Sequence, residues 1–245
     1  VGSEMCIRDR KNMNEKTAQF SLRGLFQPRD LTEGTPWKTI LAFALPIIIS
    51  YLLQQVYTIS DAAIVGQTLT AGEVAGVNDT TSIIFIFLQF AFGVSAGFCV
   101  VTAAEVGAHH EAGVRRSLAA QILLSAALTV LLTGLALLLL KPMLAWINVT
   151  PESPEVYRAA HTYCAIIFAG IGAQLFYNFI CSFLRSMGDS VTPLLFLLFS
   201  TILNIGLDLL FIVSFHWGVA GAAIATVAAQ LISTVACFIY AFARY

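Results

Sequence analysis

Residues 191–215 read VTPLLFLLFSTILNIGLDLLFIVSF, an apolar run in which Asp208 is the one charged residue. A helix needs about 20 apolar residues to cross the hydrocarbon of a bilayer, and this run is long enough. Its hydrophobicity is continuous, without the alternation of lipid-facing and lumen-facing residues that marks a membrane β-strand. The stretch therefore predicts a membrane-spanning α-helix.

Five further runs of the same kind surround this one. They are 37–65, 79–105, 117–146, 156–184 and 218–243. The chain is 58% hydrophobic and 11% charged, whereas a soluble domain carries about 25% charged residues. We therefore predict an all-α integral membrane protein whose residues 37–243 form a bundle of six transmembrane helices.

The residues outside the predicted bundle carry separate expectations. Residues 1–12 match nothing around them, and we interpret them as a non-native leader with Met13 as the true start. Residues 13–36 are polar and lack the apolar core of a signal peptide, which predicts a cytoplasmic N-terminal segment. The chain stops directly after its sixth span, which we interpret as the mark of a fragment.

Lys and Arg gather on one side of the predicted bundle, and such an excess marks the cytoplasmic side. From Met13 onward, eight lie before the first span, in the second and fourth connections or at the chain end, against Lys141 and Arg158 on the other side. We expect a multi-pass protein of the inner (plasma) membrane with a cytoplasmic N-terminus. The net charge of −1 argues against a nucleic-acid partner.

Two acids lie inside predicted spans, Asp61 in the first and Asp208 in the fifth. A charged side chain at the centre of a bilayer costs about 2.5–3.5 kcal/mol even on the gentlest scale, so such residues are functional candidates. A helix rises about 1.5 Å per residue, which puts both acids roughly 8–10 Å from the same end of the bundle. Asn204 lies one turn from Asp208, and Thr226 and Tyr163 reach the same layer.

Two carboxyl groups, an amide and a hydroxyl at one depth make an oxygen-rich pocket. Such a pocket suits a proton shared between acids or a hard cation such as Na⁺. The alternative is that each polar group only hydrogen-bonds a neighbouring helix. No nucleophile–base pair or metal-ligand spacing is present, so we predict neither an enzyme nor a bound cofactor.

Two other features concern the backbones of the spans. Pro46 lies within the first span and predicts a kink, which is either a fixed bend or a hinge that moves the Asp61 end. Gly93 and Gly97 in the second span, and Gly221 and Ala225 in the sixth, predict close helix–helix packing.

Four stretches resemble, in order and spacing, the N-terminal half of transporters of the multidrug and toxic compound extrusion (MATE) family. They are ALPIIISYLLQQVYTISDAAIVGQ at 44–67, RSMGDSVTP at 185–193, NIGLDLLFI at 204–212 and GVAGAAIATV at 218–227. The resemblance covers about residues 32–243. Ser190 and Leu209 stand where the family usually has Thr and Tyr.

The resemblance implies a function and a site. MATE transporters have twelve helices in two lobes and export small cationic amphipathic compounds in exchange for protons or Na⁺. By this resemblance the chain is one lobe in a lipid bilayer, and a C-terminal lobe is missing. The coupling-ion site that the resemblance implies, for H⁺ or Na⁺, comprises Asp61, Asn204, Asp208 and Thr226, with Tyr163 and Asn178 as neighbours.

Two alternatives remain beside the antiporter. A lipid-linked sugar flippase of the same superfamily would present several cationic side chains to its cavity, whereas the deep parts of these spans hold no Lys or Arg. A nontransporting membrane subunit or fragment is the alternative from another class. Proton and sodium sites use the same oxygens, so the sequence predicts both coupling ions equally.

Overall fold

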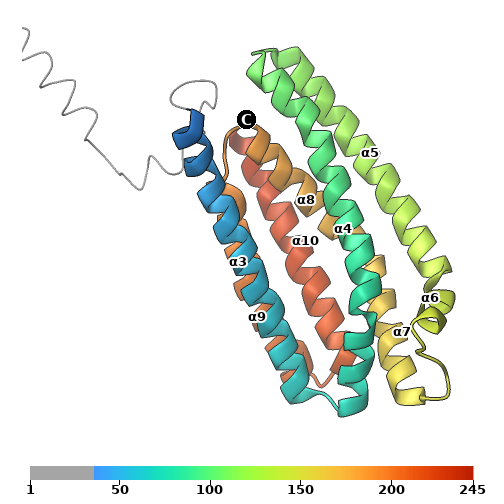
Figure 1. Ribbon diagram of the computed structural model, residues 1–245. Coiled ribbons are helices and arrows are strands. Elements are labelled where there is room, and N and C mark those ends of the chain that lie inside the picture. The colour runs from blue at the N-terminus through green and yellow to red at the C-terminus, as the bar shows by residue number, and fades with distance from the viewer. Residues whose placement is uncertain (1–35, 245) are drawn as a thin grey trace, which may run out of the picture.

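The structure is a computed structural model that describes residues 36–244. The predicted leader and all but the last residue of the predicted N-terminal segment lie outside the described residues. Figure 1 shows the described chain as a bundle of long helices, with no strand among them. In chain order they are α3 (Pro36–Thr68), α4 (Ala71–Gly107), α5 (Glu111–Leu138), α6 (Leu140–Trp146), α7 (Pro154–Ala169), α8 (Ile171–Ser186), α9 (Val191–Asp208), the π-helix η1 (Leu209–Ser214) and α10 (Gly218–Arg244).

Five helical stretches are long and apolar enough to cross a membrane. They are α3 from Thr39 onward, α4, α5, α9 together with η1, and α10. A sixth span is made by α7 and α8, which pass the same test together and meet at a bend of 45°. The predicted fold class, an all-α bundle of six membrane spans, is thereby confirmed.

The bend between α7 and α8 lies at Gly170, where the hydrophobic pattern predicted one uninterrupted helix over 156–184. Gly170 packs against α10 so closely that a Cβ atom there would lie 2.4 Å from the side chain of Val227. Sharp kinks in helices occur at a small set of causes, and a glycine in close contact is consistent with one of them. Because both halves are apolar, hydropathy alone does not reveal the break.

The connection between α3 and α4 is much shorter than the sequence indicated. The stretch GQTLTAGEVAGVND at 66–79 suggested a long joint, but only Leu69 and Thr70 lie between the two helices. Thr70 caps α4, because its hydroxyl accepts the N–H of Glu73 and the Glu73 carboxylate accepts the N–H of Thr70 at 3.1 Å. This capping box satisfies the first N–H groups and lets a helix begin directly after a tight turn.

The two ends of the bundle are named here by their place in Figure 1. The upper end holds the start of α3, the turn between α4 and α5 and the end of α10, and the lower end holds the turns from α3 to α4 and from η1 to α10. Exposed Arg115 and Arg116 lie at the upper end, in the first turns of α5. Trp146 and Trp217, 79% and 48% exposed, lie toward the lower end, as interfacial aromatic residues do.

The centre of the bundle is formed by α4, α7, α8 and α10. Phe168 is fully buried there, and its ring centroid lies 5.0 Å from that of Phe87. α9 packs on α10 and on α3, whereas α3 makes few contacts with α4 or α10. In the most apolar stretch of α3 only 11% of the residues are buried, against 44% in α10. Therefore α3 is the span held least by the rest of the described chain.

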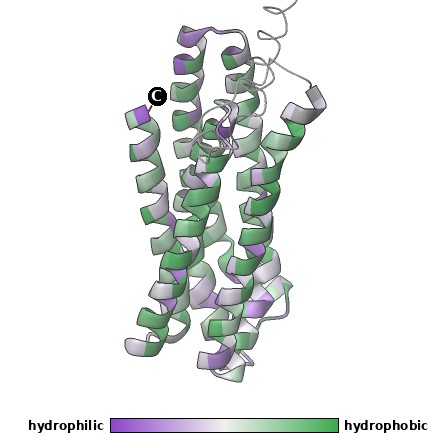
Figure 2. Cartoon of the chain, turned by 90° about the vertical axis from the view of Figure 1, so that its left-hand side faces the viewer, coloured by the Kyte–Doolittle hydropathy of each residue, from purple (hydrophilic) through white to green (hydrophobic). Residues whose placement is uncertain are grey.

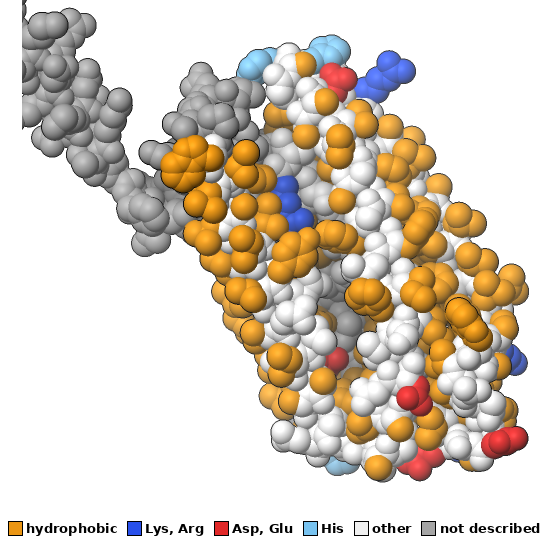
Figure 3. Space-filling model, in the orientation of Figure 1, with side chains coloured by type: hydrophobic (Ala, Val, Ile, Leu, Met, Phe, Trp, Pro, Cys, Tyr) orange, Lys and Arg blue, Asp and Glu red, His pale blue; other side chains and the backbone are white. Residues whose placement is uncertain are grey.

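Large apolar side chains cover the outside of the bundle. Figure 2 shows hydrophobic residues along the full length of the helices, and Figure 3 shows them spread over the visible face. Leu123, Val130 and Leu138 on α5, for example, are each more than two-thirds exposed. A surface of this kind is stable against lipid and not against water, so the chain is a multi-pass membrane protein.

The two predicted small-residue faces have different outcomes. Gly221 and Ala225 are buried on α10, and a Cβ atom at Gly221 would lie 3.1 Å from the backbone of Phe211, which confirms close packing. Gly93 and Gly97 face open space, where a Cβ atom would meet nothing within 4 Å. On α4 the close approach occurs instead at Gly76, where a Cβ atom would lie 2.6 Å from the carbonyl oxygen of Val156.

Candidate ion-binding site and adjoining cavity

The two acids that the sequence singled out lie together in the structure. Asp61 on α3 and Asp208 at the end of α9 are close enough for their carboxyl groups to interact directly. Asp208 is 0% exposed, and Asp61 is half-buried with one carboxyl oxygen fully enclosed. The contact between α3 and α9 therefore carries a pair of acids in its lower half.

Asp208 lies at a change of helix type. It is the last residue of α9, and the six-residue π-helix η1 begins directly after it. Short π segments are rare and occur frequently at functional sites, because the wider turn breaks the regular i→i+4 ladder. Asn204 lies one turn before Asp208 on the same buried face and is likewise 0% exposed. Nothing in the apolar sequence LLFIVS predicts the π-helix.

Two tyrosines complete the surroundings of the acids. Tyr57, one turn before Asp61 on α3, lies beside the hydroxyl of Thr226 on α10 and near both acids. Tyr163 on α7 is near the same two acids and Tyr57. The sequence placed Tyr163 and Thr226 in this layer but missed Tyr57. Its spacing of four residues from Asp61 was the available signal, because such residues share a helix face.

Most of the polar atoms in this layer have no protein partner. Six enclosed atoms make no hydrogen bond of full geometry: Oδ1 of Asp61, Nδ2 and Oδ1 of Asn204, Oδ1 and Oδ2 of Asp208, and Oγ1 of Thr226. Leaving a buried polar group unpaired costs about 1–3 kcal/mol, and the large majority of such groups in proteins are paired. All four residues of the predicted core of the site show this feature. The arrangement supplies carboxylate, amide and hydroxyl oxygens, which suit a proton or a hard cation.

A cavity of about 200 Å³ adjoins this layer. Thr226 and Tyr57 line its lower part, so the cavity and the acids share two side chains. Asn178 on α8 also lines the cavity, and nothing in the structure ties it to the acids. Figure 3 shows a cleft between α3 and α4 in which acidic atoms lie in the lower half and basic atoms in the upper half.

Pro46 lies within the continuous helix α3, about ten residues from the upper end of the bundle. It is buried, and the hydroxyl of Ser50 donates to its carbonyl oxygen at 2.8 Å. Because proline has no N–H, the carbonyl of Ala42 lacks its usual helical donor. The backbone of α3 is thus weakened at a point four turns above Asp61.

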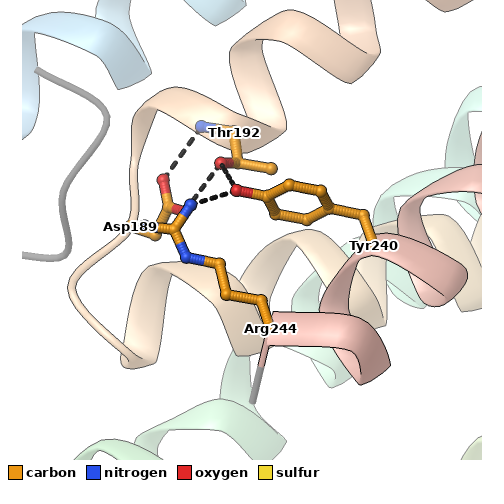
Figure 4. Close-up of polar contacts among 4 residues, drawn as sticks. All are labelled: Asp189, Thr192, Tyr240 and Arg244. Carbon is orange, nitrogen blue, oxygen red and sulfur yellow. Dashed lines mark hydrogen bonds and ion pairs between the residues drawn. The ribbon is translucent and has the colours of Figure 1, made fainter. Parts of the chain in front are cut away.

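The stretch RSMGDSVTP forms the tight turn that sets the start of α9. Gly188 has a φ of 82°, which favours glycine. Buried Asp189 accepts the backbone N–H of Thr192 at 2.9 Å and its hydroxyl at 2.6 Å. Arg244 lies 3.9 Å from the same carboxylate and donates to Tyr240 (Figure 4). This cluster ties the turn to the end of α10 and fixes the helix that carries Asn204 and Asp208.

Comparison with known proteins gives a consistent result. The MatE family profile matches residues 46–210. The chain is 32% identical over 207 residues to the probable multidrug resistance protein YpnP of Bacillus subtilis, covering 82% of this chain and 44% of that protein. It is 28% identical over 207 residues to the probable multidrug resistance protein YoeA of the same organism, covering 83% of this chain and 43% of that protein.

A solved structure gives the same result for the fold. A multidrug resistance MATE transporter of the MOP superfamily, in an outward-facing conformation, superposes with a TM-score of 0.78 at 25% identity. The match covers 85% of this chain and 46% of that one, so the chain spans about half the length of the proteins it matches. Sequence profile, relatives and fold agree, and the chain belongs to the multidrug and toxic compound extrusion (MATE) family.

Proposed function

We propose that this chain forms the N-terminal lobe of a two-lobe antiporter that exports small cationic amphipathic compounds in exchange for protons or Na⁺. The observation that carries the proposal is the pair of Asp61 and Asp208, brought together from two spans with buried oxygens that lack partners. Membership of the MATE family and relatives named as multidrug resistance proteins support it. A purely structural pair of this kind would be expected to bond its neighbours fully.

The coupling ion acts through the two helices that hold it. A proton or Na⁺ between Asp61 and Asp208 removes the repulsion of the two carboxylates and draws α3 toward α9 and η1. The bound ion thus favours one arrangement of α3, and its gradient drives the cycle because the ion prefers that conformation. Na⁺ would take oxygens from the two acids, Asn204 and Thr226.

Substrate release follows from the shared wall of the site and the cavity. Tyr57 and Thr226 line the cavity and also lie beside the acids, so a shift of α3 on ion binding changes the space for substrate. Pro46 supplies a hinge for this shift, because α3 lacks one backbone bond there. The cycle is therefore alternating access in which ion and substrate exclude each other through α3.

The orientation in the membrane is part of the proposal. The upper end, with Arg115 and Arg116, faces the cytoplasm of a cell whose inner (plasma) membrane holds the protein. The acids then lie nearer the outside, where the entering ion is taken up. The lipid-linked sugar flippase is less well supported, because Arg185 is the single Lys or Arg among the described residues that line the cavity.

The experiment that tests the proposal is export of ethidium by the two-lobe protein in proteoliposomes, with proton and sodium gradients imposed separately. Asp61→Asn and Asp208→Asn keep the size of each side chain but remove its charge, and each should abolish export while the protein still reaches the membrane. Asp79→Asn is the matched control, since Asp79 is exposed on α4. Wild-type export by either site variant, or equal loss in the control, would contradict the proposed role.

A further inference from the structure

We propose that the cavity above the acid pair binds the carboxylate of a zwitterionic amphipathic substrate, with the guanidinium of Arg185 as its counter-charge. The inference rests on the proposed function and narrows its substrate class. It assigns the upper part of the cavity, lined by Arg185, Tyr177 and Gln230, to the anionic end of the molecule. The sequence analysis counted Arg185 among the charges of a loop, but α8 extends to Ser186 and the Arg185 side chain lines the cavity.

The first support is a group of donors without acceptors. Nε of Arg185, the hydroxyl of Tyr177 and Nε2 of Gln230 are all enclosed and make no hydrogen bond. Tyr177 is only 6% exposed, so water does not readily satisfy it from outside. All three atoms carry hydrogens to donate. A ligand that meets them must bring acceptors, and a carboxylate has two oxygens able to accept several bonds.

The second support is the absence of a counter-charge for Arg185 within the cavity. No Asp or Glu is among the described residues that line it. The guanidinium is near Tyr177, Cys181 and Cys99, none of which is an acid of the carboxyl type. Asp189, in the turn after α8, is already engaged by Thr192 and Arg244. An enclosed cation without a partner is costly, which favours an anionic ligand.

The third support is the order of charges along the cavity. Gln230 lies one turn above Thr226 on α10, about 6 Å along the axis, so Thr226 marks the lower end and Arg185 the upper. The acids lie beside Thr226 and Tyr57. A ligand that spans the cleft therefore meets positive charge above and negative charge below, as Figure 3 shows for the visible face. A molecule with a carboxylate and a separate cation fits this order.

The size of the cavity limits what the upper part holds. At about 200 Å³ it is smaller than the roughly 300–1,000 Å³ of sites that enclose a drug-sized ligand. It therefore takes the carboxylate end of a larger molecule. Tyr51, Leu88 and Phe92 line the same cavity and offer apolar surface to the adjoining rings or chains of such a substrate.

The test uses two dyes that differ at one group. One is a cationic rhodamine ester, and the other is the zwitterionic rhodamine that hydrolysis of that ester gives. Binding of each to the purified two-lobe protein is measured by fluorescence anisotropy in detergent. Arg185→Gln should weaken binding of the zwitterion by at least about tenfold, as loss of a charge-assisted contact predicts, and leave the ester within about twofold. Arg116→Gln, at an exposed position on α5, should change neither.

A second variant guards against a folding defect. Tyr177→Phe removes only the hydroxyl and should weaken zwitterion binding by a few-fold, again without effect on the ester. Equal loss of both dyes in a folded variant, or no loss of the zwitterion, overturns the inference. Ethidium export is measured on the same preparations, so that a protein that binds the zwitterion through Arg185 but exports nothing would refute the antiporter and leave this assignment standing.

Discussion

The contact between α4 and α7 at Gly76 gives a stability prediction that can be worked out from distances. A Cβ atom at Gly76 would lie 2.6 Å from the carbonyl oxygen of Val156, 2.8 Å from Cβ of Ala159 and 3.0 Å from the backbone N of Ala160. Two of these three atoms belong to backbone and cannot rotate away. Gly76→Ala must therefore push α4 and α7 apart. Overpacking of this kind costs about 1–3 kcal/mol.

A matched substitution in the same helix removes the propensity effect. Gly93→Ala also replaces glycine by alanine inside α4, but its Cβ atom would meet nothing within 4 Å. Both changes gain about 1 kcal/mol of helix propensity, so the difference between them isolates the clash. For a chain of this size 1 kcal/mol shifts the melting temperature by roughly 2–4 °C. Gly76→Ala should thus melt about 2–12 °C below Gly93→Ala.

The assay can use the buried cysteines of the chain. The four described cysteines, Cys99, Cys164, Cys181 and Cys237, are all buried, so a thiol-reactive fluorophore reports unfolding on heating in detergent. A Cys6→Ser background ensures that only these four respond. Equal melting temperatures for the two alanine variants, or a higher one for Gly76→Ala, would refute the reasoning from close packing.

Two further predictions follow from hydrogen bonds already described. Thr192→Val removes the 2.6 Å bond to Asp189, and at about 1.5–3 kcal/mol for a bond to a charged group it should lower the melting temperature by roughly 3–12 °C. Thr58→Val is its control, because that exposed hydroxyl only donates to a helical carbonyl, and an equal drop there would contradict the argument. Pro46→Ala restores a backbone donor inside α3 and should raise the melting temperature while slowing ethidium export. Unchanged export in a more stable protein would remove the hinge from the mechanism.

The fold class and the acid pair were accessible from sequence for the same reason. Apolar length determines what spans a membrane, and an acid such as Asp61 or Asp208 is conspicuous within an apolar run. The constant rise of a helix then places such residues at a common depth. Which side chains meet across helices depends on rotation and tilt, and for these the family resemblance and the structure were needed.

What the sequence did not reveal depends on contacts between helices or on local backbone geometry. The break at Gly170 depends on Val227, and the π-helix after Asp208 has no compositional signal. The glycines and polar residues of 66–79 suggested a loop, although the capping box of Thr70 and Glu73 reduces it to two residues. Arg185 was assigned to a connection because hydropathy does not show that its side chain lines the cavity.

The unequal burial of the spans has a consequence for how energy moves through the protein. Asp208 belongs to α9, which packs on both sides, whereas Asp61 belongs to α3, which has few neighbours within the described chain. Elements with few buried contacts open at the lowest free energy. An ion bound between the two acids thus connects a firmly packed helix to a loosely packed one. Most of the resulting displacement falls on α3, so a small binding free energy suffices to move a whole span.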